Sequence, residues 1–150
     1  MKTLILALGN PILSDDRIAH EVADHLAKRC SNVDIIKSSA ATMDIIPQLA
    51  GYEQLVVIDA IQLGSVPVGT VHRFTLDDLT DTIRPSSPHD INFATAFQMA
   101  KQWGYDIPAD ILIYGIEVKE LLKFSECFTP QVAEKLDEIV EHILSNIRVN

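Results

Sequence analysis

The sequence predicts a single α/β domain over residues 1–150, with a twisted, mostly parallel sheet of about five strands and helices on both faces. Apolar runs of strand length alternate along the chain with segments of helical periodicity, the order typical of this class. A chain of 150 residues fits one domain and can bury roughly 70% of the surface that it exposes when unfolded. Apolar residues make up 47% of the chain, which indicates a folded core rather than disorder.

The first half of the chain alternates strands and helices. Thr3–Gly9 is a continuous apolar run that ends at Gly-Asn-Pro, which predicts a strand buried on both faces. Ser14 is predicted to cap the next helix, with two acids in its first turn. Strands are predicted at Val33–Ser38 and Gln54–Ala60, and a short helix at Thr42–Ala50. The apolar positions that recur at helical spacing after the cap are Ile18, Ala19, Val22, Ala23 and Leu26.

The second half continues the alternation with one different strand. Thr70–Thr75 alternates apolar and polar residues, as an edge or antiparallel strand does, and Asp81–Asp90 is a loop rich in Pro and Ser. A helix is predicted over Ile91–Gly104, where the glycine ends it, followed by a buried strand over Ala109–Val118. The last helix covers Thr129–Ile147, with its first residue as the cap and a proline next, at the first helical position.

Charge and cysteine content limit the partners and the location of the protein. Acidic residues number 21 against 12 basic ones, and the resulting net charge of −9 disfavours binding to nucleic acid or to anionic membrane surfaces. No apolar stretch approaches the ~18 residues of a membrane span, and the first apolar run is too short for a signal peptide. Cys30 and Cys127 have no metal-binding spacing and are expected to be free thiols. These features predict a cytoplasmic protein.

Acidic and imidazole side chains follow several of the predicted strands. Asp15 and Asp16 come after the first strand, Asp59 ends the third, and His89 precedes the third long helix. Ligands of parallel α/β sheets bind at the carboxyl ends of the strands, so these side chains can meet at one edge. Taken alone, Asp16 could simply favour the helix dipole, and His89 could be a cap or a surface residue. Together Asp16, Asp59 and His89 form an O, O, N donor set that suits Zn, Ni, Fe or Mn and leaves coordination positions open.

Four short motifs occur in order along nearly the whole chain. They are GNPILSDDRIA at 9–19, VVIDAIQLGSVPVGTV at 56–71, SPHDINFATAF at 87–97 and YGIEVKELLKFSECFTPQV at 114–132. On these motifs the chain resembles the hydrogenase maturation endopeptidases, which process the large subunit of nickel–iron hydrogenases. It departs from the family pattern at Arg17 and Ala19, where the family usually has glycines, and at Asn92.

The resemblance implies a peptidase that removes a short C-terminal extension from a nickel-loaded hydrogenase large-subunit precursor. Nickel would then arrive with the substrate as the recognition element rather than as a tightly held cofactor. Carried over by position, the metal ligands would be Asp16, Asp59 and His89, with Asp16 and Asp59 as the candidate catalytic carboxylates. Asp15 would cap the helix or support Asp16, and the chain is expected to be a monomer. The further candidates for substrate contact are Asp15, Arg17 and Asp44.

Two other functions fit parts of the pattern. A phospho-receiver signalling domain would also have an acceptor aspartate ending the third strand, at Asp59, and a lysine after a late strand, at Lys119. Its acids follow the first strand directly, however, whereas six residues, 9–14, intervene here. The second alternative is a relative that binds metal or precursor without cleaving it. The hydrolytic step also has two possible routes, a water activated by the metal or a carboxylate acting as general base.

Overall fold

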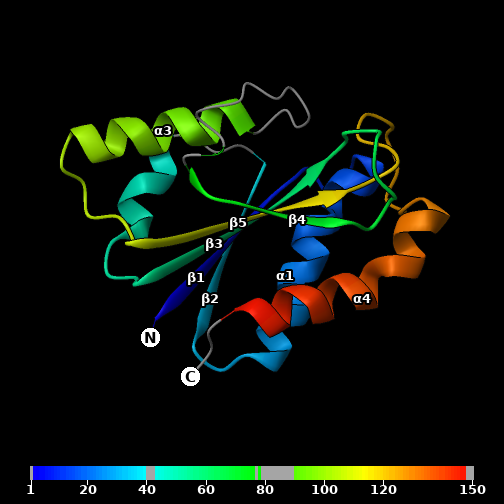
Figure 1. Cartoon of the computed structure of the whole chain (residues 1–150), viewed down its shortest axis with the longest axis horizontal. Helices are drawn as coiled ribbons and strands as arrows, with labels where there is room; N and C mark the ends of the chain where they lie inside the picture. Colours follow the sequence, from blue (N-terminus) through cyan, green and yellow to red (C-terminus); the bar gives the residue numbers. More distant parts are fainter. Residues whose placement is uncertain (1, 40–42, 77, 79–89, 148–150) are drawn as a thin grey trace.

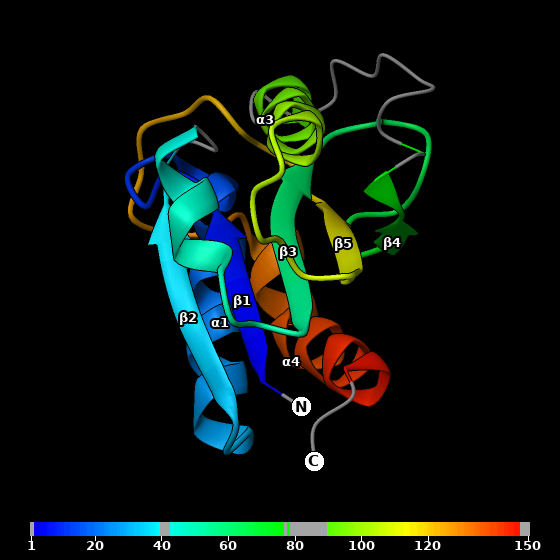
Figure 2. The ribbon, with the colours of Figure 1, turned by 90° about the vertical axis from the view of Figure 1, so that its left-hand side faces the viewer.

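The computed structural model describes residues 2–39, 43–76, 78 and 90–147. Within them one five-stranded sheet has the strand order β2-β1-β3-β5-β4 (Figures 1 and 2). This arrangement confirms the predicted α/β class with a sheet of about five strands. The strands are β1 (Thr3–Leu8), β2 (Val33–Ser38), β3 (Gln54–Ile61), β4 (Val71–Phe74) and β5 (Asp110–Glu117).

Four of these strands are parallel, and β4 is antiparallel to β5 at one edge. β1 pairs with β2 from Thr3 opposite Val33, and with β3 from Thr3 opposite Gln54. β3 pairs with β5 in parallel, and β4 runs against the outer side of β5. The alternating pattern of residues 70–75 therefore predicted the edge strand correctly. β1 and β3 are buried along their whole length, as their continuous apolar runs predicted.

Helices cover both faces of the sheet, as predicted (Figure 2). α1 and α4 pack on one face, where their apolar positions join those of the strands around Ile5 and Ile58. η2 and α3 pack on the other face, around Leu6 and Val57. The helical elements are η1 (Ser14–Arg17), α1 (Ile18–Arg29), η2 (Met43–Leu49), α3 (Asp90–Gln102) and α4 (Pro130–Asn146), with η denoting a 3-10 helix.

The start of the first helix differs from the prediction. Ser14 is not its N-cap: residues 14–17 form the separate turn η1, and α1 begins at Ile18. Ser14 has a φ of 20°, and its hydroxyl donates to the carbonyl of Cys127 (3.2 Å) rather than to a helix N–H. The apolar positions predicted to face the core from α1 are all buried. The periodicity thus identified the buried face of α1 correctly, whereas the predicted position of its N-cap was wrong.

The other helix ends follow the sequence signals closely. Gly104 has a φ of 74° just after α3, and Tyr105 N–H donates to the Ala100 carbonyl (3.1 Å), which completes the expected glycine stop. Thr129 is the N-cap residue of α4, with proline directly after it, as predicted. The helix predicted around residues 42–50 is the 3-10 helix η2, which contains Pro47. The predicted Asp81–Asp90 loop lies outside the described residues, except that Asp90 begins α3.

Two smaller expectations concern cysteines and membranes. Cys30 and Cys127 are free thiols. None of the helices in the described part of the chain is long and apolar enough to span a membrane.

Candidate functional site

Four buried carboxylates gather at the carboxyl edge of the sheet. Asp15 and Asp16 lie in η1 just beyond β1, Asp59 lies near the end of β3, and Glu117 ends β5. None of the four is more than 3% exposed. Burying a carboxylate is costly unless hydrogen bonds or a positive charge compensate. The partners of each carboxylate therefore separate structural roles from functional ones.

Asp16 is held tightly against the end of β1. Its Oδ2 accepts a hydrogen bond from the Asn10 N–H (2.9 Å), and its own N–H donates to the Leu13 carbonyl (2.8 Å). The backbone of the turn lies so close to Gly9 that a Cβ there would be 2.0 Å from the Asp16 carbonyl oxygen. Only glycine fits at this position without a shift of the turn. The residue at position 9 therefore helps to set where the Asp16 carboxylate lies.

Asp59 lies beside that turn on the neighbouring strand. Ala7 of β1 pairs with Ile58 of β3, so Asp59 is level with the last residue of β1. Side chains alternate along a strand, which places Asp59 on the same face as Leu55 and Val57, the face that α3 covers. Its Oδ1 accepts a hydrogen bond from the Ala60 N–H (2.9 Å). Asp16, in the turn that follows β1, and Asp59, near the end of the neighbouring strand β3, thus lie at the same edge of the sheet, as the sequence predicted.

Asp15 and Glu117 bind loops of their own chain. The Asp15 carboxylate accepts hydrogen bonds from the N–H groups of Lys119 (3.1 Å), Glu120 (2.8 Å) and Thr129 (2.8 Å), and from the Thr129 hydroxyl. Glu117 accepts from the N–H groups at positions 63 and 64, in the turn after β3. In this geometry Asp15 anchors the loop between β5 and α4, residues 118–129, and is closed to a substrate.

Arg17 also faces this β5–α4 loop. Its guanidinium lies over the Phe128 ring, 4.8 Å from the ring centre, and donates to the Glu126 carbonyl. A second contact is an ion pair with Glu21 on α1. The arginine that replaces the usual glycine of the resemblance therefore packs against its own chain. It adds another contact between η1 and the β5–α4 loop.

Replacing Asp15 by asparagine should destabilise the protein because an amide cannot accept hydrogen bonds on both of its heteroatoms. At least one N–H of Lys119, Glu120 or Thr129 would lose its acceptor. We expect Asp15→Asn to lower the free energy of unfolding by about 3 kcal/mol, the scale of hydrogen bonds to a charged group plus an unsatisfied donor. Urea denaturation measures this change. Thr129→Val, which removes only the hydroxyl donor, should cost about 1 kcal/mol, and equal losses in the two variants would contradict the anchoring role.

The remaining predicted site residues have different positions. Asp44 is exposed in the first turn of η2, where its backbone carbonyl accepts from the Gln48 side chain (3.2 Å). His89 lies outside the described residues. The helix that follows it, α3, begins at Asp90 and runs antiparallel to β3 and β5, with its first residues toward the carboxyl edge (Figure 1). Among the residues that the structure describes, no three His, Cys, Asp or Glu side chains cluster closely enough to hold a metal.

His20 lies near Asp16 and was not singled out from the sequence. Burial lowers the pKa of His20, against the opposing effect of a backbone hydrogen bond at Ser38 and the charge of Asp16. Its Nε2 is buried and has no hydrogen-bond partner among the described residues. The spacing after Asp16, one helical turn, was the available sequence signal. Burial thus makes the imidazole of His20 harder to protonate than a free one, although the charge of Asp16 acts in the opposite direction.

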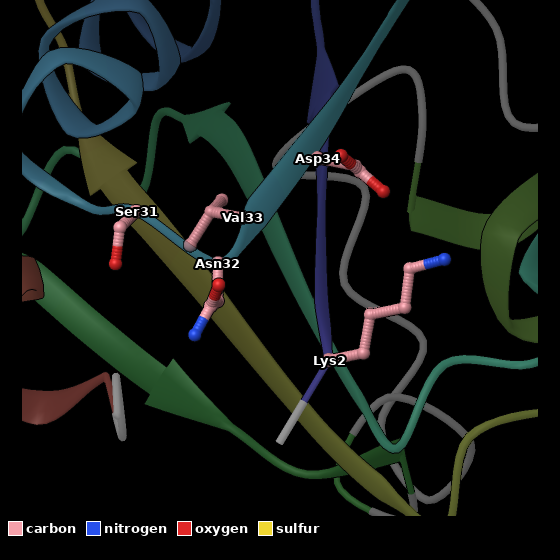
Figure 3. Close-up of a pocket in the computed structure, with 5 residues that line it drawn as sticks. All are labelled: Lys2, Ser31, Asn32, Val33 and Asp34. Carbon is pink, nitrogen blue, oxygen red and sulfur yellow. The ribbon is translucent and has the colours of Figure 1, made fainter.

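An open pocket at the opposite end of the sheet is a separate feature. Its volume is about 390 Å³, and it lies at the amino ends of β1 and β2 (Figure 3). Asp34, on its rim, accepts a hydrogen bond from the Tyr52 hydroxyl (2.6 Å), and the Lys2 ammonium lies over the Tyr52 ring. The edge at which ligands bind in such sheets is the other one. The pocket is therefore not part of the candidate site.

Comparison with known proteins identifies the family. The sequence model described as hydrogenase maturation protease (HycI) matches residues 17–146, most of the chain. The chain belongs to the hydrogenase maturation protease family. The predicted membership of this family is thereby confirmed.

The relatives of this family member differ in length. The hydrogenase expression/formation protein HupD of Thiocapsa roseopersicina is 25% identical over 146 residues, which cover 94% of this chain but 65% of HupD. The hydrogenase 2 maturation protease of Escherichia coli (strain K12) is 24% identical over 152 residues, covering 99% of this chain and 92% of the relative. The structure of the hydrogenase maturating endopeptidase HybD from E. coli matches with a TM-score of 0.79 at 23% identity, covering 97% and 91% of the two chains.

The strand order of this family member excludes the phospho-receiver alternative. The doubly wound order of receiver domains is 2-1-3-4-5, with parallel strands. Here β5 lies between β3 and β4, and β4 is antiparallel. Both folds have acids after the first strand and at the end of the third, so these acids alone do not distinguish the two folds in the sequence.

Proposed function

We propose that this protein is an endopeptidase that removes the C-terminal extension of a nickel-loaded [NiFe]-hydrogenase large-subunit precursor. Family membership supports a protease of hydrogenase maturation. The assignment of the site rests on two buried carboxylates at the carboxyl edge of the sheet, Asp16 in η1 just beyond β1 and Asp59 near the end of the adjacent strand β3.

Asp16, Asp59 and His89 are the residues that we propose to bind the nickel of the precursor. Two carboxylates and an imidazole suit a divalent first-row metal and leave positions for ligands from the substrate itself. Docking of the precursor would then gain binding energy only when nickel is present, which ties cleavage to metal loading. The tight fit of Gly9 against the Asp16 backbone supports a fixed position for one of these ligands.

The hydrolytic water can be activated in two ways within this proposal. Asp16 or Asp59 can accept the proton of the attacking water as a general base. Alternatively, the metal brought by the substrate lowers the pKa of the water or polarises the scissile carbonyl. In both routes the two carboxylates hold the reacting groups at the end of β1 and β3.

The proposal includes a cytoplasmic monomer. The free thiols of Cys30 and Cys127 support a reducing compartment, because an exposed thiol such as Cys127 persists best there. A single chain already contains all the proposed ligands, and the precursor supplies the partner surface.

The decisive experiment mixes the purified protein with nickel-loaded and with nickel-free precursor and follows the mass of the precursor. We expect loss of the C-terminal peptide from the loaded form alone. Equal cleavage of both forms would contradict nickel recognition but retain the protease. Binding of the loaded precursor without any change in mass would instead support a relative that binds but does not cleave.

A further inference from the structure

Two loops beside the candidate site expose large apolar side chains. Leu122 and Phe124 are 79% and 78% exposed in the β5–α4 loop, and Ile12 is 50% exposed in the segment between β1 and η1. Figure 1 shows the two loops next to each other at the carboxyl edge of the sheet, on the right of the view. We refer to Ile12, Leu122 and Phe124 as the apolar patch.

The backbone joins the parts of the patch directly. Leu13 and Phe124 form an antiparallel bridge, and the Ser125 N–H donates to the Ile12 carbonyl (3.0 Å). The three apolar side chains therefore belong to two loops that are joined at Leu13 and Phe124. Scattered apolar side chains are normal on protein surfaces, but apolar residues gathered beside a site mark places of interaction.

The patch is held in place by buried groups. The Asp15 carboxylate anchors both ends of the β5–α4 loop, at Lys119 and at Thr129, and the Ser14 hydroxyl donates to the Cys127 carbonyl. A loop fixed at several points keeps Leu122 and Phe124 presented to solvent. Pre-organised apolar groups of this kind lose little conformational entropy when a partner covers them.

The segment that carries Ile12 is also hydrogen-bonded to Asp16, a proposed catalytic residue. The Asn10 N–H that binds Asp16 Oδ2 is two residues before Ile12, and the Leu13 carbonyl accepts from the Asp16 N–H. A protein seated on the patch would therefore contact a segment that is hydrogen-bonded to Asp16. This placement favours the macromolecular substrate over any partner that the reaction does not involve.

We propose that the apolar patch is the surface on which the large-subunit precursor docks, through an apolar part of its own surface close to the extension that is removed. This inference rests on the proposed function, and it adds a determinant of substrate choice outside the metal ligands. Leu122 and Phe124 would act through binding of the precursor and not through the chemistry of cleavage.

The test measures steady-state cleavage of nickel-loaded precursor by the wild type and by the double variant Leu122→Ser/Phe124→Ser. We expect KM to rise about 10- to 100-fold, the scale of exposed anchors in protein interfaces, with kcat changed by less than about twofold. The matched control is Trp103→Ser/Tyr105→Ser, because these side chains are also exposed but lie between α3 and β5, at the opposite edge of the sheet. The control should keep the wild-type KM.

Each outcome separates the docking surface from the function. A wild type that cleaves the precursor, with an unchanged KM in the patch variant, would overturn the docking surface alone. A wild type that neither binds nor cleaves would overturn both. A further outcome is a wild type that sediments as a dimer and a patch variant that sediments as a monomer, with KM unchanged. The patch would then bind a second copy of the chain, and the proposal would be wrong. The single variant Leu122→Ser replaces the double variant if the latter loses its thermal unfolding transition.

Discussion

Asp59→Asn is expected to lower the rate of precursor cleavage by about 10²- to 10⁴-fold, the range attributed to a positioned general base. Asparagine has nearly the shape of aspartate and can still accept the hydrogen bond from the Ala60 N–H. The substitution therefore removes the charge and the basic oxygen while it leaves the packing at the end of β3 intact. The loss would follow equally if the carboxylate serves as a ligand for the nickel of the precursor. Single-turnover cleavage, followed by the mass of the precursor, measures the change.

The control for this experiment is a carboxylate far from the site. Asp137 is exposed on α4, which covers the face opposite α3, so Asp137→Asn should keep the wild-type rate. Asp16→Asn and His89→Ala should show losses like that of Asp59→Asn, because the proposal assigns all three to one site. A folded Asp59→Asn variant with the wild-type rate would remove this residue from the reaction.

Gly9→Ala should have the second large effect, through the position of Asp16 rather than its chemistry. The added methyl group would lie 2.0 Å from the Asp16 carbonyl oxygen, which belongs to backbone and cannot rotate away. We expect the free energy of unfolding to fall by about 3 kcal/mol or more, at the upper end of overpacking costs. Where the variant remains folded, displacement of the turn by even ~1 Å should reduce cleavage about 100-fold.

Gly51→Ala is the matched control for the glycine. Gly51 has a φ of 86°, and nothing lies within 4 Å of the position of an added Cβ, so only backbone strain opposes alanine there. The expected cost is about 1–2 kcal/mol with no loss of activity at temperatures where the protein is folded. Urea denaturation and cleavage assays on both variants test the difference. Equal activity in the two variants would show that the turn moves without consequence for Asp16.

The features that the sequence predicted well are those that depend on local pattern. Continuous apolar runs identify β1, β3 and β5 because central strands of a parallel sheet are buried on both faces. The placement of Asp16 and Asp59 at one edge of the sheet follows from the rule that ligands bind at the carboxyl ends of such strands. The α1 face that packs on the core follows from helical spacing alone.

The features that the sequence missed depend on distant contacts. Ser14 has the composition of a helix cap, but its hydroxyl bonds to Cys127, and Asp15 binds N–H groups more than 100 positions along the chain. No local pattern reveals that Arg17 lies over Phe128. An acid next to a strand end is equally consistent with a ligand, a cap or a loop anchor. The hydrogen-bond partners of Asp15 and Glu117 distinguish these roles, and they are visible only in three dimensions.

The anchoring of the β5–α4 loop by η1 has a consequence for the order of folding. The first strand and η1 leave the ribosome early, yet the partners of Asp15 lie at Lys119, Glu120 and Thr129. Contacts with such long sequence separation form late, because their loop-closure entropy must be offset by structure already in place. The turn that carries Asp16 therefore reaches its final position only after most of the chain has been synthesised. A nascent chain would therefore contain Asp15 and Asp16 long before it has a site, because the contacts that fix η1 form in a late step of folding.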